Sequence, residues 1–267
     1  MYSKGVTLTG KGPAIVFLHS SLSSSKQWRK LALQLSHDFT CINIDLLGYG
    51  DAEQVAEAST YSFETEISRI NNVLKQLKVN DKYHLVGHSC GGAIALKMAV
   101  ENPSKLESLS LYEPVAFHLY ENSADEKDRD FLQQIKHFAE KIALLDNNLA
   151  TQAFVDFWNQ EGYFKALPKT LQQIMSNDIG KVHLDFKGIL HECYSLDDLK
   201  NINCPTMVLY GKYSPEISQR LSKKIIENLT HVYQLEVSSG HMAPISHADL
   251  VEPEINEFVR NNTINSL

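Results

Sequence analysis

Short apolar runs alternate along this chain with longer stretches in which apolar residues recur at helical spacing. The apolar runs are rich in β-branched residues and nearly continuous, which is typical of strands covered on both faces. Because helical patterns separate the runs, their order predicts βαβ units and a mostly parallel central sheet flanked by helices, an α/β fold. The expected strands occupy residues 14–19, 40–45, 83–88, 106–112, 206–211 and 232–237.

Two helices between these strands carry clear start signals. Residues 62–77 place apolar side chains on one helical face, and Ser62 is a candidate N-cap before the first turn. A second helix is expected at 215–228, where Pro215 takes the first helical position. Ser214 precedes this proline, and we expect its side chain to cap the helix.

One long segment interrupts the alternation of strands and helices. Residues 120–200 contain three amphipathic helical patterns and no convincing strand, which predicts an inserted helical cap. The chain then divides into the first part of an α/β core (1–119), the cap (120–200) and the second part of the core (201–267). Aromatic residues of the cap would suit an apolar or aromatic substrate group, or would only pack the cap onto the core: Phe131, Phe138, Phe154, Phe157, Trp158, Tyr163 and Phe164.

The composition is that of an ordinary globular protein. The 267 residues fit one α/β domain with an insertion, and 43% of them are hydrophobic and 21% charged. Apolar stretches of about 18 residues are absent and residues 1–12 lack a secretory signal, so we expect no membrane span and a cytoplasmic location. The net charge of −7 disfavours nucleic acid or an anionic membrane as the main partner. We expect a small-molecule substrate and a monomer or homodimer.

The cysteines indicate neither a metal site nor a disulfide framework. Cys41, Cys90, Cys193 and Cys204 are widely scattered, and no CxxC pair occurs. We therefore expect reduced thiols, no metal and no cofactor.

The most informative short motif is GHSCGG at residues 87–92, which joins the expected strand at 83–88 to a helical pattern. It fits G-x-S-x-G, a strand-to-helix turn that exposes a nucleophilic serine, here Ser89, above a sheet. Glycines two residues before and after the serine allow the strained backbone of this turn. The backbone N–H of Cys90, at the start of the helix, would face an acyl oxyanion.

With this motif, the chain resembles the α/β-hydrolase family over nearly its whole length. FLHSSLSSSKQW (17–28) is similar to the family's oxyanion loop, INIDLLGYGDA (42–52) to its D-x-x-G-x-G turn and SSGHMAPISH (238–247) to its histidine loop. The resemblance implies an α/β-hydrolase fold with His241 as the catalytic histidine. It also implies that the N–H of Ser21 is the second donor of the oxyanion hole, beside the first donor in the turn.

Two other histidines near these motifs have structural explanations. We expect His19 and His88 to pack and donate hydrogen bonds beneath the oxyanion loop and the serine turn. The family usually has glycine after the first of these histidines, whereas this chain has Ser20. The loop therefore lacks the backbone freedom of glycine at that point.

The acid of the site departs most from the family pattern. Family members usually place an aspartate in a G-x-x-D turn after the strand equivalent to 206–211, but here that turn ends at Ser214. A serine cannot hold a negative charge against an imidazolium. Glu113 ends the strand after the nucleophile, a position from which certain haloalkane dehalogenases take their acid. The chain order Ser89, Glu113, His241 keeps the order of nucleophile, acid and histidine.

An alternative explanation exists for this glutamate. It would pair with a lysine or cap a loop, and Glu216 or Asp45 would then be the acid. The catalytic interpretation is favoured because an unpaired buried glutamate would cost several kcal/mol.

These residues predict acyl transfer to water. His241 would deprotonate Ser89, whose oxygen would attack a carbonyl while the N–H groups of Ser21 and Cys90 hold the oxyanion. We expect a hydrolase of a small, apolar or aromatic carboxylic ester, or of a related acyl or C–C bond. A serine nucleophile argues against epoxide hydrolase and haloalkane dehalogenase chemistry, which use an aspartate there. A cofactor-free perhydrolase resembling haloperoxidases and a non-catalytic ligand-binding protein are the alternatives.

Overall fold

A seven-stranded sheet forms the centre of the computed structural model, which describes residues 3–263. The strands lie in the order β1-β3-β2-β4-β5-β6-β7; β1 pairs antiparallel with β3, and the other neighbours are parallel. Each of the six expected runs forms a strand, so the predicted sheet is confirmed, and β1 is an addition at the edge. The strands are β1 Val6–Thr9, β2 Ala14–Leu18, β3 Thr40–Ile44, β4 Tyr83–His88, β5 Leu106–Tyr112, β6 Thr206–Gly211 and β7 Val232–Val237.

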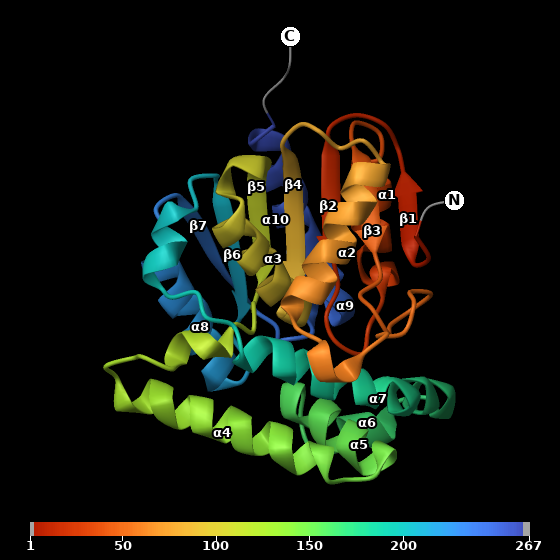
Figure 1. Cartoon of the computed structure of the whole chain (residues 1–267), viewed down its shortest axis with the longest axis vertical. Helices are drawn as coiled ribbons and strands as arrows, with labels where there is room; N and C mark the ends of the chain where they lie inside the picture. The colour runs from red at the N-terminus through yellow and green to blue at the C-terminus, as the bar shows by residue number, and fades with distance from the viewer. Residues whose placement is uncertain (1–2, 264–267) are drawn as a thin grey trace.

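Helices cover both faces of the sheet, with α2 and α3 in front and α10 behind in Figure 1. Successive side chains of a strand point to opposite faces. Accordingly, Leu85 of β4 packs in one hydrophobic cluster with Ile94 of α3, whereas Val86 packs in a second cluster with Ile255 of α10. These helices are α1 Arg29–Leu35, α2 Phe63–Gln76, α3 Ser89–Glu101, α8 Glu216–Glu227, α9 Ala243–Ser246 and α10 Ala248–Asn261.

The remaining α-helices of the described chain gather below the sheet in Figure 1: α4 Glu126–Ala143, α5 Asn147–Trp158, α6 Tyr163–Ala166 and α7 Lys169–Leu190. They occupy the segment in which the sequence predicts helices. The expected pattern stops at residue 175, yet α7 continues for another 15 residues, to 190. Its second half holds buried polar residues such as Lys181 and Asp185, which interrupt the apolar stripe. The described residues also form five short 3₁₀ helices: Ser25–Trp28, Ala58–Thr60, Pro103–Lys105, Phe117–Tyr120 and Asp197–Asn201.

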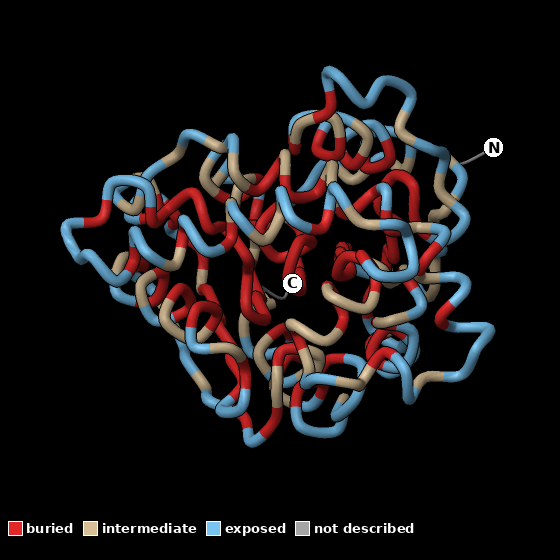
Figure 2. The backbone as a smooth tube through the Cα atoms, turned by 90° about the horizontal axis from the view of Figure 1, so that it is seen from below, coloured by how far each residue is buried: buried red, intermediate tan, exposed pale blue. Residues whose placement is uncertain are grey.

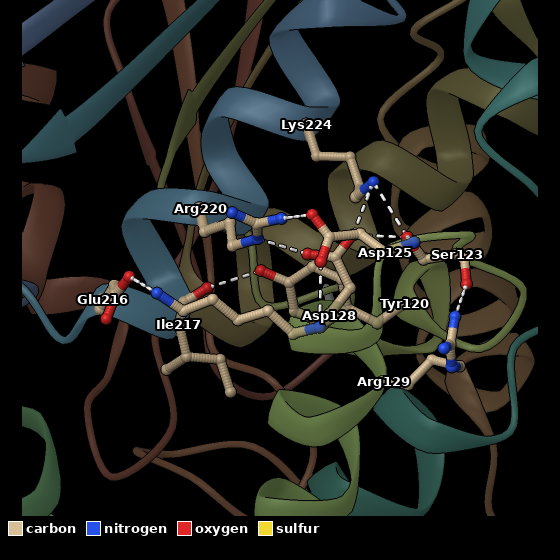
Figure 3. Close-up of polar contacts among 10 residues, drawn as sticks. Tyr120, Ser123, Asp125, Asp128, Arg129, Glu216, Ile217, Arg220 and Lys224 are labelled. Carbon is tan, nitrogen blue, oxygen red and sulfur yellow. Dashed lines mark hydrogen bonds and ion pairs between the residues drawn. The ribbon is translucent and has the colours of Figure 1, made fainter.

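A cluster of ion pairs joins the start of α4 to α8 (Figure 3). The buried Asp128 carboxylate pairs with Lys224 Nζ at 2.7 Å and with Arg220, and it accepts a hydrogen bond from Ser123 Oγ at 2.5 Å. Lys127 pairs with Glu216 at the exposed edge of the cluster. These pairs hold α4 against α8, the helix that follows β6 of the sheet.

Three predictions made from the sequence are wrong. The strand at 232–237 was expected to be covered on both faces, but β7 is an edge strand and Tyr233 is 47% exposed. Ser214 does not cap α8, because the N-cap residue is Pro215 and there is no side-chain cap hydrogen bond. Pro215 was expected at the first helical position but lies one residue before it, and its fixed φ leads the chain into the helix without a serine cap.

The buried residues lie mainly in the middle of the molecule, around the sheet. Figure 2 shows this as buried segments of the backbone at the centre and exposed segments around them. Within residues 3–263, no helix is both long enough and apolar enough to cross a membrane.

Candidate active site

Ser89 lies in a strained turn at the carboxyl end of β4. Its φ of +54° is in the left-handed region, which non-glycine residues rarely adopt. A Cβ at Gly87 would lie 2.6 Å from the Gly91 carbonyl oxygen, and one at Gly91 would lie 2.4 Å from that of His19. Both glycines are therefore needed for the turn to pack, as the G-x-S-x-G motif indicates.

Glu113 ends the neighbouring strand in a second unusual backbone conformation. It has a φ of +41°, and its side chain is fully buried. Oε1 accepts the backbone N–H of Gly211 at 2.6 Å, and Oε2 accepts the hydroxyl of Ser218 at 2.7 Å. The carboxylate thus reaches from β5 into the turn after β6, the turn that carries aspartate in the family that the sequence resembles.

His241 joins Ser89 and Glu113. Its Nδ1–H donates to Glu113 Oε2 at 2.6 Å, and its Nε2 accepts from Ser89 Oγ at 2.9 Å. The loop that carries the imidazole is held from below, because the His88 ring donates to the His241 carbonyl at 2.8 Å and Tyr112 OH donates to the Gly240 carbonyl at 2.8 Å. Three side chains from three separate loops therefore form one continuous chain of hydrogen bonds.

The other candidate acids are engaged elsewhere. Asp45 accepts the N–H groups of Ser25 at 2.6 Å and Asp51 at 2.9 Å, so it orders the loops after β2 and β3. Glu216 is mostly exposed and pairs with Lys127. The buried hydroxyl of Ser214 has no hydrogen-bond partner among the described residues. Among Asp45, Glu216, Ser214 and Glu113, Glu113 is therefore the side chain that is hydrogen-bonded to His241.

Ser21 and Cys90 both lie near the serine. Cys90 is the second residue of α3, where backbone N–H groups have no partner within the helix. Ser21 lines the same small pocket as Ser89, and within residues 3–263 its backbone N–H bonds to no acceptor. Ser20 has no positive φ, so this loop does not need the glycine that the family usually has. Its N–H and its hydroxyl both donate to Gln27 Oε1 at 3.2 Å.

Burial sets the protonation of the groups around the serine. It raises the pKa of the Cys90 thiol well above its usual range, and the nearby Asp185 carboxylate adds to this, so Cys90 is not a thiolate nucleophile. Burial lowers the pKa of His88 well below 6.5, with His241 as a second cause, and lowers that of His19 to about 4. Both rings are therefore neutral at pH 7 and act as hydrogen-bonding supports.

Trp158 of α5 covers the histidine. Its ring stacks on the His241 ring with centroids 4.0 Å apart and an angle of 24° between the planes. Two cavities meet at this point and share Ser21, Phe154 and Trp158. Ser89 lines the smaller one, with a volume of about 10 Å³, and an open cleft of about 1040 Å³ leads away from it.

A buried charged network lies beside the loop that carries Ser21, and it was not predicted from the sequence. Asp185 of α7 accepts the hydroxyls of Ser21 at 2.5 Å and Tyr49 at 2.6 Å. Lys181 pairs with Asp185 and, at 3.2 Å, with Glu66 of α2. Burial lowers the pKa of the Lys181 ammonium, but the carboxylates of Asp185 and Glu66 outweigh it and raise that pKa above its usual range. The i,i+4 spacing of Lys181 and Asp185 was the available signal in the sequence.

Replacing Lys181 by methionine is expected to lower the free energy of unfolding by about 3–5 kcal/mol, because two buried carboxylates would lose their common cation. The matched control is Lys200→Met, since Lys200 forms an exposed pair with Asp197; its effect should stay within about 1 kcal/mol. Urea unfolding at pH 7 measures both variants. Equal stabilities for the two variants would contradict the assigned role of the network.

The sheet topology defines an α/β fold, and the polar cluster lies at the carboxyl ends of the strands, where such folds place their ligand sites. The chain belongs to the alpha/beta hydrolase fold family, whose model matches residues 13–248. The prediction of an α/β-fold hydrolase is therefore confirmed.

Known relatives cover most of the chain. A fluoroacetate dehalogenase from Burkholderia sp is 26% identical over 222 residues, which are 76% of this chain and 72% of that protein. A pimeloyl-[acyl-carrier protein] methyl ester esterase from Legionella pneumophila is 26% identical over 267 residues, which are 94% of this chain and 97% of that protein.

Solved structures show the same fold at lower identity. An esterase from Exiguobacterium antarcticum superposes with a TM-score of 0.76 and 21% identity, over 97% of this chain and 100% of that chain. The enol-lactonase from Burkholderia xenovorans superposes with a TM-score of 0.75 and 16% identity, over 96% of each chain. The protein is thus a hydrolase related to esterases and a dehalogenase and similar in fold to a lactonase.

Proposed function

We propose that this hydrolase cleaves small apolar or aromatic carboxylic esters, or a related acyl or C–C bond, through an acyl-enzyme on Ser89. The observation that carries the proposal is the hydrogen-bond chain from Ser89 Oγ through His241 to Glu113, with distances of 2.9 and 2.6 Å. In this arrangement the histidine can take the serine proton while the glutamate stabilises the imidazolium.

The first half-reaction starts at Ser89 Oγ, which attacks the carbonyl carbon as its proton passes to His241 Nε2. The N–H groups of Ser21 and Cys90 hold the oxyanion of the tetrahedral intermediate. When the intermediate collapses, Nε2 gives its proton to the leaving oxygen and the acyl group stays on the serine. In the second half-reaction His241 activates a water, which releases the acid and restores the serine.

The nucleophile favours acyl transfer over dehalogenation. Displacing a halide through an alkyl-enzyme ester needs a carboxylate at the serine turn, and this chain has the hydroxyl of Ser89. The esterase relative fits the site better in this respect than the dehalogenase relative does.

We also propose that residues 120–200 act as a cap between two parts of the core, 1–119 and 201–267. Support comes from Trp158, which reaches from α5 onto the His241 ring, and from Asp185, which reaches from α7 to Ser21. Helices of this segment thus contact both the histidine and the oxyanion loop.

Partitioning of the acyl group tests the acyl-enzyme. Acetate esters with different leaving groups should give one constant ratio of acetic acid to methyl acetate when methanol is added, because all would pass through the same acetyl-enzyme. A ratio that changes with the leaving group would contradict the proposal. The proposal would also be contradicted if the protein cleaved no ester but catalysed halogenation in the presence of peroxide.

A further inference from the structure

The two cavities beside Ser89 differ greatly in the space that they offer. The small pocket has a volume of about 10 Å³, which is about what one water molecule needs (roughly 10–15 Å³). The cleft, at about 1040 Å³, is as large as the largest usual small-molecule sites. A substrate that spans both cavities must therefore have one small and one large side.

The position of His241 decides which side of the substrate enters which cavity. Its Nε2 must protonate the leaving oxygen, so the leaving group has to extend past the histidine. Met242 and Pro244, which follow His241 in the chain, line the cleft and not the small pocket. Ser89, which holds the acyl group, lines the small pocket and not the cleft. The leaving group therefore points into the cleft and the acyl chain into the small pocket.

The walls of the small pocket leave no room for a longer acyl chain. The lining of this pocket includes Val115 and Phe117, which follow β5, and four residues of α7: Val182, Asp185, Phe186 and Ile189. All six are buried in the closely packed interior. An acyl chain longer than acetyl would overpack these side chains, and one methylene in such a pocket changes the rate by about 10- to 200-fold.

Apolar side chains line much of the cleft and continue to the surface, and charged residues such as Lys26, Arg29 and Asp178 line it as well. Leu33 and Ile245 contribute from the core, and Leu171 and Ile174 from α7. Their exposed fractions of 51%, 48%, 40% and 57%, respectively, show that the apolar surface extends to the cleft mouth. A large apolar leaving group would cover this surface and gain affinity from its burial.

We propose that the site is selective for acetyl-sized acyl groups joined to large apolar alcohols. This inference rests on the proposed function, because it assumes acyl transfer through Ser89. It adds a substrate class that follows from the two volumes and from the position of His241 next to residues that line the cleft.

Two series of esters test the two sides separately. Among p-nitrophenyl esters, kcat/KM for the acetate should exceed that for the butyrate by at least about tenfold, and that for the octanoate by more. Among alkyl acetates, kcat/KM should rise by at least about tenfold from ethyl to octyl acetate, whose leaving groups have similar chemistry. Butyrate or octanoate as the preferred acyl group would overturn the inference while leaving the proposed function standing. Hydrolysis of no ester at all would overturn both the inference and the ester part of the proposed function.

A pair of variants on α7 tests the pocket itself. Ile189→Ala enlarges the small pocket and should raise the butyrate-to-acetate ratio of kcat/KM by at least about tenfold. Ile179→Ala is the matched control, because Ile179 is equally buried on the same helix and lines neither cavity. Val182→Ala makes a smaller deletion in the same pocket and replaces Ile189→Ala if that variant does not fold. An unchanged ratio in the folded pocket variant would overturn the inference.

Discussion

Replacing Glu113 by glutamine should lower kcat for p-nitrophenyl acetate by about 10⁴-fold. A glutamine amide carries no charge to stabilise the His241 imidazolium. Its NH₂ group can also donate to Nδ1, which would leave the proton on Nε2, where the ring has to accept from Ser89. Steady-state kinetics at pH 7 with circular dichroism as a fold check measure the effect.

Two control variants make the result specific to Glu113. Glu216→Gln changes an exposed carboxylate that pairs with Lys127, and Ser214→Ala removes the hydroxyl at the position where the family usually has its acid. Both should keep the wild-type rate to within a few-fold. A Glu113→Gln variant as active as wild type would mean that the acid lies elsewhere.

Replacing Ser89 by alanine should lower kcat by about 10⁶-fold, the largest loss that we expect from any single substitution. Without Oγ no acyl-enzyme forms, and the residual rate would come from the oxyanion donors and from binding. The matched control is Ser222→Ala, because Ser222 is also a buried serine and lines neither cavity. If Ser89→Ala kept more than about a hundredth of the wild-type rate, the nucleophile would be another residue.

The strands and the serine turn could be predicted because their signals are local. The apolar runs that form β4 and β5 indicate buried strands by themselves. The glycines at 87 and 91 indicate a tightly packed turn, whatever other segments pack around it. Glu113 could also be placed, because parallel neighbouring strands end at the same edge of the sheet. His88 of β4 and Tyr112 of β5 are register partners, so the residues that follow them lie side by side.

The rest of the site depends on contacts between distant segments. Lys181 pairs with Glu66, which is 115 residues earlier in the chain (181 − 66), and no local pattern predicts that pair. Trp158 is one of ten aromatic residues in the segment 120–200, and nothing in the sequence singles it out as the ring that stacks on His241. Both contacts arise only when α5 and α7 dock on the core.

The most direct test of a working triad is labelling with a fluorophosphonate probe, followed by mass mapping of the labelled peptide. The probe reacts quickly only with a serine that a base activates. Wild type should carry the label on Ser89 within minutes, and Glu113→Gln should label far more slowly. Absence of a label on Ser89 in folded wild-type protein would contradict the claim that His241 and Glu113 activate this serine.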